Sequence, residues 1–241
     1  MKNKLPLLLL LLAAATVLHA QGLVTAQRPW FCDVEGAQLH YVRTYAGNGT
    51  VRWTQDVTIQ QVRQDARGVD IRYQSEFRNA SGRIMYGGPI PLEARVNMNG
   101  DLSVDFGASS AAMVKGVIGG IGKILKVNYD RVRMDTPATL RPGTALDDLL
   151  TVIRVGPLRY TVSVDQRKVL PFEDITTPAG TFHCIVTEEH KIEEGPAHNR
   201  RTVSRSWYAR GIGVIRHDTY SEAMELMETE ILQEIRYPKQ F

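Results

Sequence analysis

Polar and apolar residues alternate strictly over several stretches of the chain, which is the period-two pattern of a strand with one buried face. Residues 69–77 read VDIRYQSEF, in which every second residue is apolar or small and the others are polar. The same alternation predicts strands over residues 158–164 and 229–237. In the last of these, Ile231 is expected on the buried face and Glu230 on the exposed face.

Short turn signals (AGNG, DARG, NASG and NMNG) separate these stretches at the spacing of hairpins. The apolar residues from Val51 to Ile59 share one parity and Val62 has the other, which predicts a β-bulge near residues 60–61. Strand follows strand without intervening helical patterns. We therefore expect a mainly β fold, in which one antiparallel sheet is curled into a half-barrel or packed as a sandwich.

One stretch departs from the strand pattern. Residues 107–127 read GASSAAMVKGVIGGIGKILKV, and on a helix their lysines and their apolar residues fall on opposite sides. We therefore expect one short amphipathic helix near residues 108–126. Each of its four internal glycines costs about 1 kcal/mol relative to alanine, so the helix should form only when its apolar face is docked.

Three interpretations of this helix are open: a helix packed on the sheet, a mobile lid over an apolar cavity, and a contact with a membrane surface. The lid interpretation predicts a site for a hydrophobic ligand. The residues that would line or cover that site are Met113, Val117, Ile118, Ile121, Ile124 and Leu125.

The N-terminus has the features of a secretory signal peptide: Lys2 and Lys4, an apolar run over residues 5–18, and a small residue, Ala20. The run is shorter than the roughly 20 residues of a membrane span. Cleavage after Ala20 leaves residues 21–241 as a single β-rich domain and removes two lysines, so the net charge falls from +3 to +1. We expect an exported protein of the periplasm or the cell surface, without a transmembrane span after cleavage. Its near-neutral charge argues against a nucleic-acid partner.

Two cysteines, Cys32 and Cys184, are the candidates for covalent chemistry. His183 is the sequence neighbour of Cys184, but neighbours in a strand point to opposite faces and cannot pair directly. Outside the cytosol two cysteines are more often paired than free. We therefore predict a disulfide between Cys32 and Cys184, worth about 5 kcal/mol in chain-entropy models. Two buried thiols, or a catalytic or redox cysteine, are the alternatives.

The sequence contains no motif specific for a metal, a nucleotide or a catalytic nucleophile. The histidines lack metal-ligand spacing, the glycine-rich stretch lacks the spacing of a P-loop, and there is no G-x-S-x-G. We therefore expect no metal, no cofactor and no catalytic residues. A hydrolase with a site dispersed across several strands is the enzyme alternative.

Two C-terminal motifs, TTPAGTFHC (residues 176–184) and WYARGIGVIRHDTY (207–220), and the start GAQLHY (36–41) resemble the TapB-like family. These are exported proteins of Bacteroidetes-type bacteria with a 3108-like domain of unknown function. The resemblance implies a β-rich envelope protein without established catalysis, whose sheet is akin to the half-barrels of lipoprotein carriers. The motif residues suit tight turns, a bulge and aromatic anchors of the core. They are Pro178, Gly180, Phe182, Trp207, Tyr208, Gly211 and Gly213.

These features predict a non-catalytic envelope protein that binds a hydrophobic ligand, a lipid or an apolar segment of an envelope protein, in its curled sheet. The alternative is a structural or protein–protein interaction module of the envelope. Such a module would use an exposed apolar patch or a free edge strand.

Overall fold

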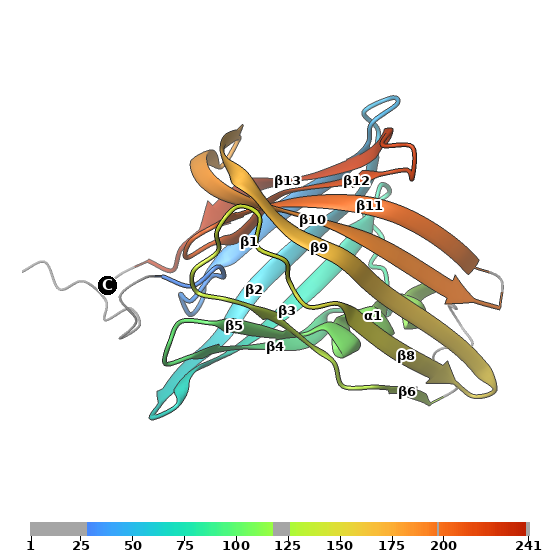
Figure 1. Ribbon diagram of the computed structural model, residues 1–241, viewed down its shortest axis with the longest axis horizontal. Coiled ribbons are helices and arrows are strands. Elements are labelled where there is room, and N and C mark those ends of the chain that lie inside the picture. The colour runs from blue at the N-terminus through green and yellow to red at the C-terminus, as the bar shows by residue number, and fades with distance from the viewer. Residues whose placement is uncertain (1–27, 118–125, 197, 240–241) are drawn as a thin grey trace, which may run out of the picture.

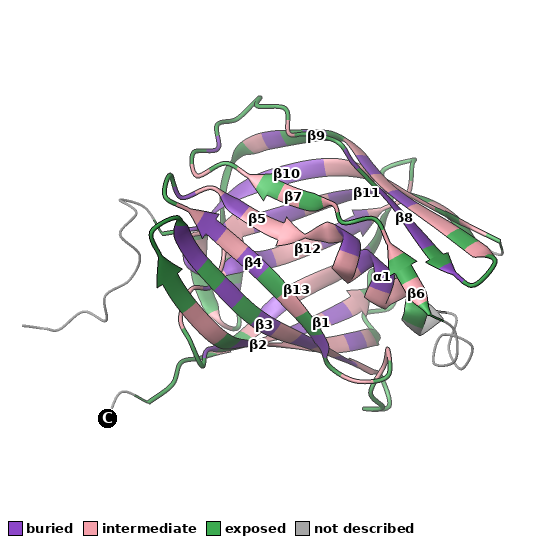
Figure 2. Ribbon diagram, turned by 90° about the horizontal axis from the view of Figure 1, so that it is seen from below, coloured by how far each residue is buried: buried purple, intermediate pink, exposed green. Residues whose placement is uncertain are grey.

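The computed structural model describes residues 28–117, 126–196 and 198–239. Within these ranges the fold is one antiparallel sheet of 13 strands, in the order β6-β8-β9-β10-β11-β12-β13-β1-β2-β3-β4-β5-β7. The sheet is strongly curled, and the helix α1 lies between its two ends (Figures 1 and 2). The mainly β fold is therefore confirmed, as a curled sheet and not a sandwich. The elements are β1 (Gln38–Tyr45), β2 (Val51–Asp65), β3 (Gly68–Asn79), β4 (Ile90–Asn97), β5 (Leu102–Asp105), α1 (Phe106–Val117), β6 (Val127–Tyr129), β7 (Arg133–Thr136), β8 (Leu149–Val155), β9 (Leu158–Thr177), β10 (Gly180–Gly195), β11 (His198–Ala209), β12 (Gly213–Tyr220) and β13 (Leu226–Arg236).

The predicted alternation is confirmed most clearly in β3, where Ile71, Tyr73, Ser75 and Phe77 are all buried. The register between β2 and β3 shifts next to Ile59, so the predicted bulge is present as well. Because a bulge moves the following residues to the other parity, β2 keeps apolar side chains on the concave face on both sides of it.

In β13 the predicted faces are wrong. Glu228 is buried, and Glu230 lies beside Arg43 on β1 and His217 on β12, whereas Ile231 is only partly buried. The concave neighbours of these carboxylates are themselves polar or charged. Pairing with a buried cation, and not exposure to water, therefore decides which face of β13 carries the glutamates.

The two ends of the sheet, β6 and β7, do not pair with each other. Residues 130–132 connect them, and α1 contacts β8 and β6 on one side and β4 and β7 on the other (Figure 2). The start of α1 lies close to this connection at Gly107, whose N–H donates to the carbonyl of Val132 at 3.1 Å. A Cβ at Gly107 would come within 2.3 Å of the carbonyl oxygen of Asp130, so this position requires glycine.

Helix α1 begins where the Asp105 side chain accepts a hydrogen bond from the N–H of Ala108 at 2.8 Å, an N-terminal cap. Ala111 of the helix is buried against the sheet, and Lys115 in its last turn is exposed. It occupies the first half of the range predicted for it. The second half, residues 118–125, lies outside the described residues.

One end of the curled sheet, here the closed end, carries the β2–β3, β9–β10 and β11–β12 turns and is covered by residues 28–34. The Trp30 indole donates to the carbonyl of Ala138 at 3.2 Å, and the Arg210 guanidinium lies over its ring at 3.9 Å. The opposite end, here the charged end, carries the β1–β2, β10–β11 and β12–β13 hairpins (Figure 1).

Candidate functional site: an interior cavity and its charged end

The concave face of the sheet lines a half-open cavity with a volume of about 410 Å³. This volume falls in the range of about 300–1,000 Å³ that small-molecule sites occupy. Strands β1 to β5, helix α1 and the segment at the closed end supply most of its lining, which is predominantly apolar. Representative lining residues are Phe31, Leu39, Ile59, Tyr73, Leu92 and Met113.

Met113 is the member of the predicted ligand-binding set that the structure places on the cavity. Helix α1 also contributes Phe106 and Ser109 to the lining. The remaining predicted residues, Ile118, Ile121, Ile124 and Leu125, lie outside the described residues, as does the side chain of Val117. Helix α1 therefore forms part of the cavity wall between Phe106 and Met113.

A buried charged cluster lies at the charged end of the cavity. Arg43 Nε donates to Glu228 at 2.7 Å, Arg43 Nη1 donates to Glu230 at 3.2 Å, and Arg43 Nη2 donates to the Thr219 hydroxyl. The Arg43 and Glu228 side chains are only 9% and 4% exposed. All three nitrogens of this guanidinium are therefore paired, as a buried cation requires.

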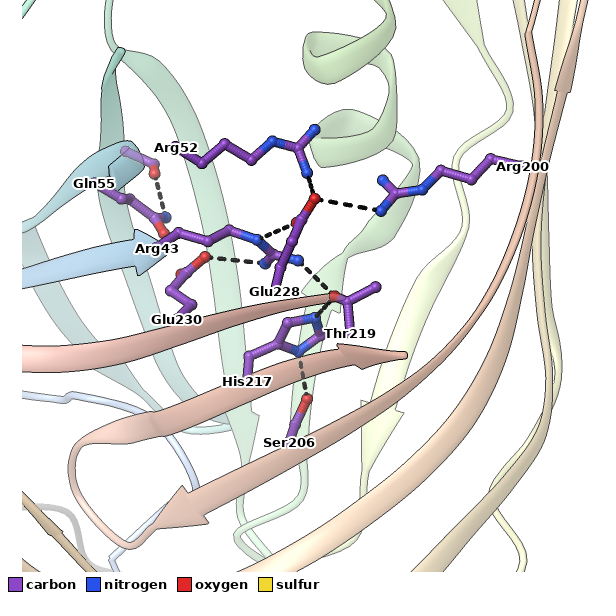
Figure 3. Close-up of polar contacts among 10 residues, drawn as sticks. Arg43, Arg52, Gln55, Arg200, Ser206, His217, Thr219, Glu228 and Glu230 are labelled. Atoms are coloured by element: carbon purple, nitrogen blue, oxygen red, sulfur yellow. Dashed lines mark hydrogen bonds and ion pairs between the residues drawn. The ribbon is translucent and has the colours of Figure 1, made fainter. Parts of the chain in front are cut away.

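Two further guanidinium groups converge on the same glutamate. Arg52 Nη1 hydrogen-bonds Glu228 Oε1, and Arg200 Nη2 lies 3.5 Å from that oxygen. These arginines come from β2 and β11, which are separated in the sheet by three strands, and they approach Glu228 from different sides (Figure 3). Burial, and then the charges of Arg200 and Arg43, lower the pKa of Arg52. We call Arg43, Arg52, Arg200, Glu228 and Glu230 the arginine cluster.

His217 and Ser206 line the cavity beside this cluster. Their side chains meet at 2.8 Å between His217 Nδ1 and Ser206 Oγ, a geometry that resembles a nucleophile with its base (Figure 3). Burial lowers the pKa of His217 to about 3, reinforced by the charges of Arg43 and Lys191. A base so far from neutral pH is poorly matched to deprotonating a hydroxyl. The second ring nitrogen faces Thr219 at 3.5 Å and not a carboxylate, so the pair lacks the third member of a triad.

The predicted disulfide is absent: Cys32 and Cys184 are both free and buried. Burial raises the pKa of Cys184 to about 12, and the Cys184 thiol lies 3.5 Å from the carbonyl oxygen of Phe182. Burial also raises the pKa of Cys32. Both thiols belong to the same apolar core without a bond between them, so the disulfide predicted from the exported compartment is wrong. A raised thiol pKa is the opposite of what an activated cysteine nucleophile needs.

The motif residues occupy turns and core positions. Pro178 lies in the β9–β10 turn, and Phe182 packs on the core from β10. Trp207 donates to Glu173 at 2.8 Å, and Tyr208 lines the cavity. The three glycines adopt positive φ angles that other residues rarely adopt, which fits their places in the two turns. Their φ angles are 136° at Gly180, 71° at Gly211 and 102° at Gly213.

In the described part of the chain, no three or more His, Cys, Asp or Glu side chains gather as potential metal ligands. Nor does any helix there have the length and apolar character needed to cross a membrane.

The sequence pattern of the DUF3108-like family matches residues 34–232, which is most of the chain. The chain belongs to the DUF3108-like family. Two solved structures share its fold. One is described as a "putative exported protein with YmcC-like fold" from Bacteroides fragilis: it is 21% identical, the match covers 87% of this chain and 99% of that chain, and the TM-score is 0.70. The other is a "putative lipoprotein" from Parabacteroides distasonis, 19% identical with the same coverage and TM-score. No curated protein matches the chain.

In this DUF3108-like chain, sequence reasoning missed the arginine cluster. A signal for part of it exists in β1, where Leu39, Tyr41 and Arg43 share one parity, so Arg43 falls in phase with buried residues. Arg52 and Arg200 give no comparable signal, because only the curl of the sheet brings β2 and β11 to the same glutamate.

Proposed function

We propose that this protein is a non-catalytic, exported envelope protein that binds an elongated apolar ligand inside its curled sheet. The observation that carries the proposal is the cavity of about 410 Å³ with its mainly apolar lining. A folded core normally fills such space with side chains, so an apolar cavity of this size is suited to a ligand. The first 20 residues act as its export signal in this proposal.

Two further observations support a binding role over catalysis. His217, which contacts a serine in the cavity, is held neutral by burial, and both cysteines are buried with raised pKa values. The solved relatives are described as an exported protein and a lipoprotein, and this supports placing the chain in the cell envelope.

Native mass spectrometry of the mature protein, purified from the envelope of its own host, tests the proposal. We expect a co-purifying apolar mass, and displacement of a fluorescent fatty-chain probe by added dodecanol. Val57 lines the cavity, so Val57→Phe should fill part of it and weaken probe binding by about tenfold or more. Val51 is exposed at the start of β2, and Val51→Phe is the matched control that should leave binding unchanged. An empty protein that fails to bind the probe would contradict the proposal.

A second candidate, an interaction module of the envelope, is favoured by one specific feature. The β1–β2 and β12–β13 hairpins lie side by side, since the N–H of Ala46 donates to the carbonyl of Met227 at 2.9 Å. Together they present a row of exposed apolar side chains, the kind of patch that marks contact surfaces. These are Tyr45, Val51, Met224, Leu226 and Met227. Chemical cross-linking in the envelope of the host tests this candidate. A partner protein that cross-links to the unaltered chain but not to Met224→Ser/Leu226→Ser, while both proteins bind the probe, would support this function.

A further inference from the structure

We propose that Arg52 and Arg200 bind the anionic head of an amphiphilic ligand, a carboxylate or a phosphate ester, whose apolar tail occupies the cavity. This inference rests on the proposed function and specifies its class of ligand. It concerns the charged end of the cavity, where the two side chains meet at Glu228 (Figure 3).

The guanidinium groups of Arg52 and Arg200 have more N–H donors than they have protein acceptors. Among the described residues, Arg52 makes one side-chain hydrogen bond, to Glu228, and Arg200 makes only its 3.5 Å ion pair with the same carboxylate. A guanidinium carries five N–H donors, so most of these donors have no protein acceptor. The side chains are 28% and 29% exposed, whereas Arg43 beside them is buried and has a partner at each of its three nitrogens.

The charge balance of the arginine cluster favours an anion. The cluster contains three arginines and two glutamates, so it carries an excess of one positive charge. The nearest further charges on β10, Lys191 and Glu193, pair with each other at 2.8 Å and leave this excess in place. A planar guanidinium binds a carboxylate or phosphate with two parallel hydrogen bonds, and two converging guanidinium groups bind it more strongly.

The head site lies next to the cavity. Arg43 and Trp53 both line the cavity, and the Arg52 guanidinium lies over the Trp53 ring at 4.4 Å. Arg52 is therefore one aromatic ring away from the cavity wall. A head group held between Arg52 and Arg200 directs its chain past Trp53 towards the apolar closed end, where Phe31 and Ile59 lie.

Isothermal titration calorimetry at pH 7 and low salt, on the delipidated mature protein, tests this inference with laurate, dodecanol and dodecyl phosphate. These probes share one chain and differ in their heads. Hydrogen bonds to a charged group are worth about tenfold or more in affinity, so laurate or dodecyl phosphate should bind at least about tenfold more tightly than dodecanol. Whichever anion binds more tightly identifies the preferred head. Arg52→Gln/Arg200→Gln should reduce the affinity for both anions to that for dodecanol, and leave dodecanol binding unchanged.

The matched control is Arg72→Gln/Arg236→Gln, which removes two exposed arginines that each pair with one glutamate. It changes the net charge equally and should leave every affinity unchanged. Equal binding of anions and alcohol by the unaltered protein would overturn the head site while the proposed function stands. Equal loss of all three ligands in Arg52→Gln/Arg200→Gln would show a structural role and also overturn it; Arg200→Gln, which removes only the longer contact, repeats the comparison in a gentler variant. If no probe binds the unaltered protein, the proposed function itself fails.

Discussion

The closed end and the charged end of the cavity are built on the same strands but are filled by opposite kinds of side chain. At the closed end, Trp30 and Phe31 seal the curled sheet with apolar and aromatic packing. At the charged end, Arg43 and Glu228 are buried just as thoroughly, and ion pairs take the place of apolar contacts. A single strand, β1, runs from one environment to the other within five residues, from Leu39 to Arg43.

This contrast shows what the interior is suited to hold. Apolar packing alone would complete the core with equal or greater stability, because the attraction within a buried ion pair barely offsets the solvation that its charges lose. Charges kept inside one end of an apolar cavity therefore point to a ligand with two unlike ends. Variants at the two ends should therefore differ in how far they lower the free energy of unfolding.

The largest expected effect is at the charged end. Arg43→Met leaves Glu228 and Glu230 without their central buried cation, and we expect it to lower the free energy of unfolding by about 3–5 kcal/mol. Urea unfolding measures the change. Arg72→Met, which removes an exposed arginine paired with Glu93, is the control and should cost no more than about 1 kcal/mol. If both variants lose a similar small amount of unfolding free energy, the charges of the cluster are screened by solvent and do not need Arg43 as a partner.

The next prediction compares a cavity-lining residue with a residue packed on all sides. Ile59 and Ile215 are both fully buried, but only Ile59 faces the cavity. Truncation of a core isoleucine to alanine costs about 2–5 kcal/mol, and more where all contacts are lost. We expect about 4 kcal/mol for Ile215→Ala and about 2 kcal/mol for Ile59→Ala in urea unfolding. Equal losses would indicate that the space beside Ile59 is filled by protein in solution.

The next effect should appear only in acid, where it grows as the pH falls. The pKa of His217 is lowered to about 3 by burial, so between about pH 6.5 and pH 3 the unfolded chain takes up a proton that the folded protein does not. Stability linked to His217 is therefore complete above pH 6.5 and falls by up to about 1.4 kcal/mol per pH unit below it. His217→Gln removes this term, so the difference in unfolding free energy between the variant and the unaltered protein should shift in favour of the variant as the pH falls. Urea unfolding of both proteins across this pH range measures the difference.

The sequence predicted the strands better than the site, for physical reasons that particular residues show. Alternation along β3 identified its buried face because every buried position there is apolar or small. It failed in β13, where Glu228 and Glu230 point inward, since their cations come from other strands. The helix was predicted from its own amphipathic pattern. The contact between Arg52, Arg200 and Glu228 depends on the curl of the sheet, which no local pattern encodes.

The smallest expected effect concerns the cysteines, and it tests whether packing alone holds the closed end. Because Cys32 and Cys184 are free and buried, reductant should change neither the intact mass nor the thermal midpoint. Cys32→Ala and Cys184→Ala should each cost about 1 kcal/mol, and their effects should add in the double variant, as expected for sites that are not bonded. In the native protein both thiols should resist a thiol reagent and react only after unfolding, because burial raises their pKa values. A mass deficit of two hydrogens, with a double variant no worse than either single variant, would instead show that a covalent bond secures this end.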